Sequence, residues 1–224
     1  NLVAGAMTRH RRFETSELVA QRLPLLRHAM ASVAHVAIRN RGTIGGSLCH
    51  ADPSAEWPAL CLVCDATMLL QSRRGTRSLD ADAFSQGLFS TALASDEMLV
   101  RVVFPAWPQG RRWGFQEVAR RRGDFAIAGV ACVLDVDAAD ACTHARIVAF
   151  GVGDRPLLLA EAAARLTGGV PDAAAVREAA RSARATVDCR SDHHASAAYR
   201  GELLQALTAR AIAQALRQQE CGTQ

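Results

Sequence analysis

The spacing of apolar positions in the first half of the chain predicts a mixture of helices and strands. Apolar residues recur near the helical period over 15–34, where Pro24 is expected to bend or split the helix. Asp52 and Pro53 are typical of an N-cap followed by proline at the first helical position, which predicts a second helix over 53–64. Shorter apolar runs predict strands at 1–7, 68–71, 77–79 and 97–104, and a short helical turn at 80–86.

In the second half, apolar runs over 125–136 and 145–152 are separated by a polar turn, so they predict a hairpin of two strands. The small residues in the first of these runs indicate close packing against another element. Three later segments have the helical pattern: 157–166, 173–187 and 198–217.

The two halves are separated by Pro105, Pro108 and Gly110, which interrupt the apolar pattern. Proline- and glycine-rich stretches of this kind are typical of domain boundaries. A chain of 224 residues is long enough for one large domain or two small ones. We therefore expect two domains, over 1–106 and 111–224.

Composition excludes several classes of protein. Half of the residues are hydrophobic, which excludes intrinsic disorder. All 26 basic residues are arginine, but the net charge is only +4 and aromatic residues make up 5%, so a nucleic-acid interface is not expected. The arginine-rich segment 9–12 is interpreted as a solvated turn, whereas the triplet 120–122 is equally compatible with a phosphate contact and with a solvated start of a strand. No apolar stretch is long enough to span a bilayer, and no signal peptide is recognisable.

Seven cysteines, an odd number in a chain too large to need disulfides, indicate a reducing compartment, so a cytoplasmic location is expected. Cys61 and Cys64 have the CxxC spacing, but no second pair accompanies them and both fall in an apolar helix. Core packing is therefore favoured over a zinc or redox site. Cys189, His193 and His194 are interpreted as turn residues before the last helix, and no metal site is expected.

The segment 36–55 is rich in glycine, with Gly42, Gly45 and Gly46 inside five residues. Glycine lets the backbone turn sharply and approach a ligand closely, and successive free N–H groups in such a loop can bind an anion. The spacing matches neither the P-loop nor the GxGxxG fingerprint. From these residues alone, a plain turn and a ligand-binding loop both remain open.

The segment 39–56, Arg-Asn-Arg-Gly-Thr-Ile-Gly-Gly-Ser-Leu-Cys-His-Ala-Asp-Pro-Ser-Ala-Glu, resembles the second flavin-binding motif of a known family. This family is the FAD-carrying medium subunit of molybdenum hydroxylases, the carbon monoxide dehydrogenase and xanthine dehydrogenase superfamily. Segments 5–10, 115–126 and 191–200 are similar to further family motifs in the same order. The resemblance implies an α+β fold: a partial FAD-binding domain of the PCMH type, followed by a CO-dehydrogenase flavoprotein C-terminal-like domain of antiparallel sheet and helices.

The resemblance also implies which residues bind FAD, while no catalytic residue is expected in this chain. The segment Thr43, Ile44, Gly45, Gly46 and Ser47 is expected on the diphosphate and ribityl arm, where glycines admit the pyrophosphate and hydroxyls donate hydrogen bonds. The other expected cofactor contacts are Asp52, the acid Glu56, Val100 beside the isoalloxazine, and Glu117, which with Gln116 stands where the family frequently has lysine.

By the same resemblance, the chain is expected to pass electrons from [2Fe–2S] clusters of a small subunit, through FAD, to NAD, oxygen or a quinone. A large subunit would bind molybdopterin, and the assembly would be a dimer of heterotrimers. Because the family's first flavin motif has no counterpart here, the chain is expected to start part-way into the family pattern. A structural subunit with a vestigial flavin site is the alternative. A stand-alone flavin oxidase is a further one, which no substrate-side group of residues supports.

Overall fold

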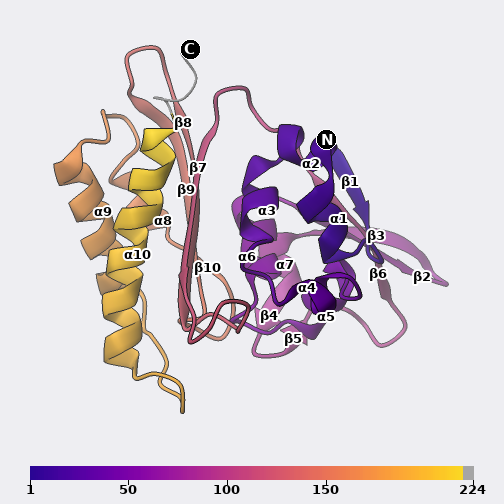
Figure 1. Ribbon diagram of the computed structural model, residues 1–224. Coiled ribbons are helices and arrows are strands. Elements are labelled where there is room, and N and C mark those ends of the chain that lie inside the picture. The colour runs from indigo at the N-terminus through magenta and orange to yellow at the C-terminus, as the bar shows by residue number, and fades with distance from the viewer. Residues whose placement is uncertain (219–224) are drawn as a thin grey trace.

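The computed structural model describes residues 1–218 and has the α+β architecture expected from the sequence. Two parts lie side by side, each with its own antiparallel sheet (Figure 1). The first sheet takes its strands from residues 2–104 and the second from residues 112–158. Of the cysteines considered above, Cys221 lies outside the described residues.

The first sheet has the strand order β1-β6-β2-β3, and all neighbouring strands are antiparallel. The hairpin expected near 68–79 is confirmed, with Ser72 paired with Gly75 at its tight turn. A short helix and a small two-stranded sheet of β4 and β5 follow the hairpin along the chain. The elements are β1 (Leu2–Gly5), β2 (Thr67–Ser72), β3 (Gly75–Asp80), α7 (Ala81–Phe84), β4 (Ser85–Gly87), β5 (Ser90–Thr91) and β6 (Met98–Phe104).

The single helix expected over 15–34 is divided into α2 (Glu17–Arg22) and α3 (Pro24–Ala29). The break follows from Pro24, which takes the first helical position of α3, where its missing N–H costs nothing. The arginines of segment 9–12 are exposed as expected, but the segment is the start of helix α1 (His10–Thr15), which buries His10 and Phe13, and not a turn. The helix forms here because the buried side chains of His10 and Phe13 pack into the core between the exposed arginines.

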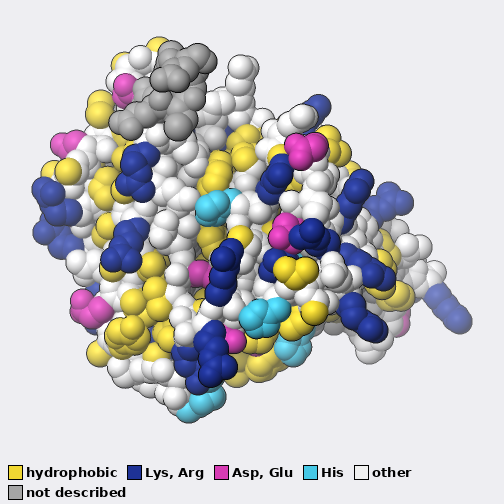
Figure 2. Space-filling model, in the orientation of Figure 1, with side chains coloured by type: hydrophobic (Ala, Val, Ile, Leu, Met, Phe, Trp, Pro, Cys, Tyr) yellow, Lys and Arg dark blue, Asp and Glu magenta, His cyan; other side chains and the backbone are white. Residues whose placement is uncertain are grey.

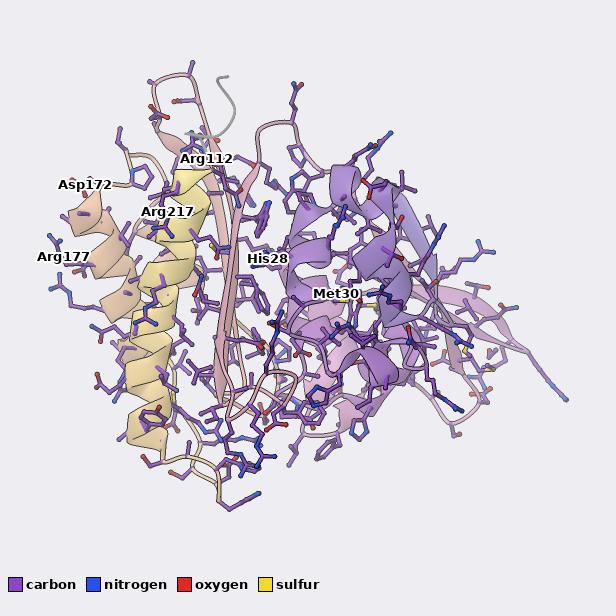
Figure 3. All side chains as sticks on the ribbon, in the orientation of Figure 1. His28, Met30, Arg112, Asp172, Arg177 and Arg217 are labelled. Atoms are coloured by element: carbon purple, nitrogen blue, oxygen red, sulfur yellow. The ribbon has the colours of Figure 1, made fainter. Side chains whose placement is uncertain are left out.

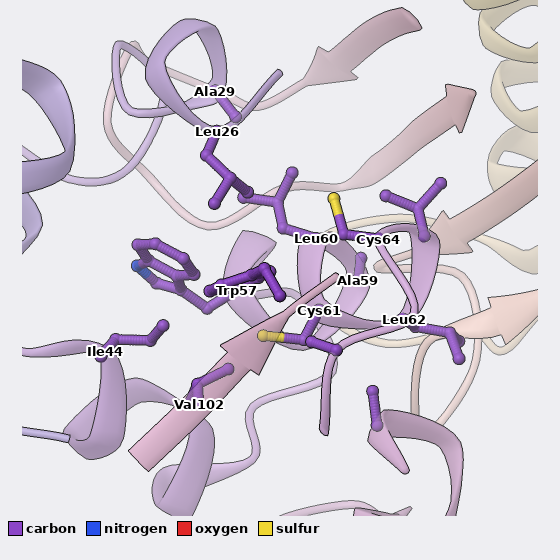
Figure 4. Close-up of a cluster of buried hydrophobic side chains, with 14 of the residues drawn as sticks. Leu26, Ala29, Ile44, Trp57, Ala59, Leu60, Cys61, Leu62, Cys64 and Val102 are labelled. Carbon is purple, nitrogen blue, oxygen red and sulfur yellow. The ribbon is translucent and has the colours of Figure 1, made fainter. Parts of the chain in front are cut away.

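Helix α6 (Glu56–Val63) forms the centre of the first part, and every one of its residues is buried. Figure 4 shows Trp57, Cys61 and Cys64 among the aliphatic side chains of this core. The expected core role of the two cysteines is confirmed. The expected helix start was wrong: α6 begins three residues later, and the Asp52 carboxylate instead accepts from the Ser54 N–H (2.8 Å) in a turn.

The second sheet has the order β10-β9-β8-β7 and is covered on both faces (Figure 1). Helix α10 packs on one face, while α6 and α3 of the first part pack on the other. Gly129 of β8 is small for a cross-strand reason, since an added Cβ would lie 2.1 Å from the ring of Phe150, its partner on β9. The elements are β7 (Arg112–Val118), β8 (Ala128–Val136), β9 (Cys142–Phe150), β10 (Leu157–Leu158), α8 (Ala160–Ala164), α9 (Ala173–Thr186) and α10 (Ala197–Arg217).

Two sequence expectations for the second part need correction. The helix expected from residue 157 begins at Ala160, because Leu157 and Leu158 pair with β9. The strand expected from residue 125 begins at Ala128, since residues 123–127 form a loop. The last two helices agree with the prediction to within a residue at each end.

The two parts are joined by specific contacts as well as by apolar packing. Figure 3 shows His28 reaching from α3 toward the second sheet, where its ring lies 4.9 Å from that of Trp113. Arg146 of β9 donates from Nε to the Leu62 carbonyl at the end of α6 (2.8 Å). Arginine side chains are spread across both parts of the face shown in Figure 2. Within residues 1–218, none of the helices is both long and apolar enough to cross a membrane.

Candidate cofactor site

A cavity of about 580 Å³ lies where the two parts meet, and we call it the junction cavity. Its walls come from four segments: residues 7–10, residues 33–50, residues 55–56 at the start of α6, and the loop 123–125 between β7 and β8. The segment 33–50 contains the short helices α4 (Val36–Arg39) and α5 (Ile44–His50). Both the volume and the mixed lining are typical of a small-molecule site.

The glycine-rich segment is held by hydrogen bonds to residues 6–10. His10 donates from its backbone N–H to the Gly42 carbonyl (3.0 Å), and Ile44 donates to the Thr8 carbonyl (3.0 Å). Helix α5 begins immediately afterwards, so the loop expected from the sequence is a paired segment followed by a helix. The Thr43 side chain caps this helix by accepting from the Gly46 N–H (3.1 Å).

This pairing changes what the segment offers to a ligand. Gly45 donates to the Ala6 carbonyl (2.8 Å) and Ser47 to the Thr43 carbonyl (3.1 Å), so the four amides of residues 44–47 all donate within the chain. Residues 44–47 therefore do not form an anion-binding loop of free N–H groups. The segment presents Thr43, Gly46 and Ser47 to the cavity instead.

The two adjacent glycines have different reasons for being glycine. A Cβ added at Gly45 would lie 2.7 Å from the Cβ of Ala6 and 2.8 Å from its carbonyl oxygen, so this position has room only for hydrogen. At Gly46 the single close atom is Thr43 Oγ1, at 3.1 Å, and the residue is exposed along the cavity wall. Gly45 is required for internal packing, whereas the absence of a side chain at Gly46 keeps this part of the cavity wall open.

Glu56 places a buried carboxyl group in the wall of the junction cavity, with 4% of the residue exposed. Its pKa is raised to about 8, mainly by burial and secondarily by the neighbouring carboxyl of Glu117, with a smaller contribution from Asp52. Glu56 therefore carries a proton at neutral pH and can donate a hydrogen bond as well as accept one.

Glu117 lies on β7 close enough to Glu56 for their charges to interact. Burial raises its pKa to about 7, although a hydrogen bond with Ser32 partly opposes this. Its Oε2 atom is buried and has no hydrogen-bond partner within residues 1–218. This incompletely paired carboxyl is outside the cavity lining and acts on the site through its electrostatic interaction with Glu56.

His10 was not anticipated from the sequence, yet it is buried in the cavity wall with 5% exposure. Its Nδ1 accepts a hydrogen bond from Trp57 Nε1 (2.8 Å), so the neutral ring carries its proton on Nε2. Burial, and secondarily the charge of Arg39, lowers its pKa to about 4. His10 thus adds a neutral polar side chain to the wall.

The opposite wall comes from the second part of the molecule, through Gly123, Asp124 and Phe125. Gly123 has a φ of +86°, and an added Cβ would meet the backbone of Ala34 at 3.0 Å. This close approach sets the loop against the first part. Phe125 remains 57% exposed at the mouth of the cavity.

Comparisons with known proteins place both parts in one family. Residues 1–107 match the family model described as the FAD binding domain in molybdopterin dehydrogenase, and residues 113–215 match the CO dehydrogenase flavoprotein C-terminal domain. The chain belongs to the FAD-binding medium subunits of molybdenum hydroxylases. The family and the fold class expected from the sequence motifs are confirmed.

Individual relatives agree with this membership. The 6-hydroxypseudooxynicotine dehydrogenase complex subunit alpha of Paenarthrobacter nicotinovorans is 37% identical over 215 residues, 96% of this chain and 73% of that protein. Quinoline 2-oxidoreductase from Pseudomonas putida 86 has a similar structure, with a TM-score of 0.92, 40% identity and coverage of 97% of this chain and 75% of that one. Carbon monoxide dehydrogenase from Hydrogenophaga pseudoflava matches with a TM-score of 0.93 and 34% identity, over 96% of this chain and 75% of that one.

In this medium subunit, the residues expected to contact FAD fall into three groups. Four of them, Thr43, Gly46, Ser47 and Glu56, line the junction cavity. Glu117 and Asp52 are not in the lining, but both interact electrostatically with Glu56. The remaining three are outside the cavity lining: Ile44 is fully buried, Gly45 packs on Ala6, and Val100 lies in β6 with its carbonyl accepting from the Ala6 N–H at 2.9 Å.

Sequence reasoning missed several lining residues besides His10, notably Arg41, His50 and the 123–125 loop. Arg41 directly precedes Gly42 within the glycine-rich segment. A cation next to these glycines is a signal for an anion-binding site that could have been used. The loop offers a weaker signal, a glycine within an Arg-Gly-Asp turn. Within the described part of the chain, no three or more His, Cys, Asp or Glu side chains are grouped so that they could hold a metal ion.

Proposed function

We propose that this chain binds FAD in the junction cavity and carries electrons between a partner subunit and an acceptor. The observation that supports this most strongly is the combination of the open Gly46 with the buried Glu56 carboxyl in one cavity wall. FAD, when bound, supplies the redox chemistry of the subunit. The protein supplies the binding surface, the orientation and the local electrostatics.

Each lining residue has a role that follows from its chemistry. Gly46 gives a phosphate or ribityl group room to approach the backbone, and the hydroxyls of Thr43 and Ser47 add hydrogen-bonding groups. Arg41 places a cation at the same wall, which suits a diphosphate. The protonated Glu56 can donate to an oxygen or nitrogen of the cofactor. We propose Ile44, Gly45, Asp52, Val100 and Glu117 as supporting positions behind this contact layer.

The assembly we propose follows the family. A large subunit would carry molybdopterin and oxidise the substrate, a small subunit would carry [2Fe–2S] clusters, and two such heterotrimers would associate. The acceptor would be NAD, oxygen or a quinone. Free cysteines support a cytoplasmic location, since all six cysteines among residues 1–218 are unpaired.

A structural subunit with a vestigial flavin site is the second candidate function. The observation in its favour is that the amides of residues 44–47 already donate within the chain. The absorbance spectrum of the purified complex separates the two candidates. Flavin bands at stoichiometric intensity, lost when the chain is omitted from the assembly, support the electron carrier. A complex with intact partner subunits and no flavin bands would support the scaffold.

A further inference from the structure

Arg200, near the start of α10, is almost completely buried, with 2% of the residue exposed. Such burial is rare for arginine. Its NH1 group donates to two backbone carbonyls, those of Ile127 and Gly151. Its NH2 group donates to the Asp192 carboxylate at 2.6 Å. A buried guanidinium is costly unless it is paired, so these three contacts define its place closely.

Asp192 is itself fixed by the turn that leads into α10. Its Oδ1 accepts from the backbone N–H groups of His194 (2.8 Å) and Ala195 (3.1 Å), while Oδ2 takes the Arg200 contact. The segment 191–200, which the family resemblance singled out, therefore folds as one rigid clamp around a charged pair.

The two carbonyls held by Arg200 belong to loops that contact the first part of the molecule. Ala126, next to Ile127, donates from its N–H to the Ser54 carbonyl (3.3 Å), and Gly151 donates to the Pro53 carbonyl (2.8 Å). The loops also touch each other, since a Cβ added at Gly151 would lie 2.9 Å from the Ala126 carbonyl oxygen.

The residues joined by these hydrogen bonds neighbour, along the chain, residues that line the junction cavity. Residues 53–54 precede Ala55 and Glu56, which line one wall, and residues 126–127 follow Phe125, which lines the other. A continuous path of backbone contacts therefore runs from Arg200 to both walls. An apolar side chain at this position could fill the space, but it could not hold two carbonyls together.

We propose that Arg200, held by Asp192, is a positioning residue for the cofactor: it fixes the 123–127 loop against the turn before Glu56 and so sets the width of the junction cavity. This inference rests on the proposed FAD site. It assigns to the C-terminal helix a part in cofactor binding without direct contact.

The test uses the purified complex with Arg200→Met, and with Leu207→Ala as the matched control. Leu207 lies on the same helix in the second hydrophobic core, so its truncation destabilises the C-terminal part without touching the clamp. FAD affinity is measured by fluorescence titration well below both melting temperatures. Arg200→Met is expected to weaken FAD binding roughly tenfold relative to Leu207→Ala, and Arg200→Lys to recover part of the loss.

Hydrogen exchange gives a readout that does not depend on FAD. Arg200→Met is expected to lower the protection of the Ala126 and Gly151 amides, while Leu207→Ala leaves them protected. Equal FAD affinity and equal protection in the two variants would overturn the proposal. If wild type itself binds no FAD, the proposed function fails, and the exchange experiment alone still decides whether Arg200 positions the two loops.

Discussion

Two hollows of nearly equal size lie in this molecule, and they differ in chemistry. The junction cavity, about 580 Å³, contains the buried polar residues Glu56 and His10. The other, about 570 Å³, is a cleft in the second part lined by residues 153–161 and 186–190, which we call the C-terminal cleft. Its acidic residues are exposed, so water screens their charges. Volume alone therefore does not distinguish the two hollows, whereas the buried carboxyl group of Glu56 does.

The most severe test of this contrast is a large side chain in the wall of the junction cavity. Gly46→Leu is expected to abolish stoichiometric FAD binding, because the new side chain extends into the space that the cofactor needs. The melting temperature should change little, since the residue is exposed and leucine favours a helix. Flavin content and thermal unfolding are measured on the same preparation.

The neighbouring glycine provides the matched control. Gly45→Ala is expected to cost about 1–3 kcal/mol of unfolding free energy, because its Cβ would collide with Ala6. Its FAD affinity, measured below the transition, should remain closer to wild type than that of Gly46→Leu. The reverse ranking would show that the cavity wall has been assigned to the wrong glycine.

The next largest effect is on the pH dependence of stability. The pKa of Glu56 is raised from 4.5 to about 8, so the unfolded state loses this proton first and stability falls as pH rises through that window. Each pH unit inside it contributes about 1.4 kcal/mol. Glu56→Gln is therefore expected to flatten the decline between pH 5 and 8 in urea unfolding experiments. Glu161 is exposed, so Glu161→Gln serves as the control and should behave like wild type. If Glu56→Gln shows the same decline as wild type, the claim that the Glu56 carboxyl is desolvated is wrong.

A smaller loss is expected from the hydrogen bond between His10 and Trp57. His10→Phe leaves the fully buried Trp57 N–H without its acceptor, which costs about 1–3 kcal/mol. The double variant His10→Phe/Trp57→Phe removes both partners, so the two losses should be less than additive in chemical denaturation. Simple additivity would mean that this bond contributes nothing.

The C-terminal cleft should show the smallest effect. Leu158 is 42% exposed in its wall, and Leu158→Ser is expected to change stability by less than about 0.5 kcal/mol. FAD affinity, measured by equilibrium dialysis, should be that of wild type. A clear loss of FAD binding in this variant would indicate that the cofactor binds in the C-terminal cleft and not in the junction cavity.

Local sequence patterns predicted those elements whose causes are local. The hairpin around Gly75 and the long helix α10 are examples, because turn residues and a continuous apolar face specify them directly. The start of α6 could not be predicted in this way: Asp52 has the residue type of an N-cap but uses its carboxylate in a turn. The helix start predicted at Leu157 was wrong for a similar reason, because Leu157 pairs with β9 although the residues that follow it are helical.

The site shows the same division. Thr43, Gly46, Ser47 and Glu56 belong to one motif, so the sequence led directly to one wall of the cavity. The other wall depends on the loop 123–125, which meets the first wall only through tertiary packing. The difference between Gly45 and Gly46 is also tertiary, since it depends on where Ala6 lies. Adjacent residues of the same type can thus be told apart only by their three-dimensional surroundings.

The most direct test of the central claim is a crystal structure of the complex with FAD bound to this chain. The account predicts cofactor density in the junction cavity, with the diphosphate or ribityl arm beside Gly46 and Ser47 and a polar cofactor atom within hydrogen-bond distance of Glu56. Density in the C-terminal cleft, or a junction cavity filled by protein side chains in the presence of saturating FAD, would contradict it.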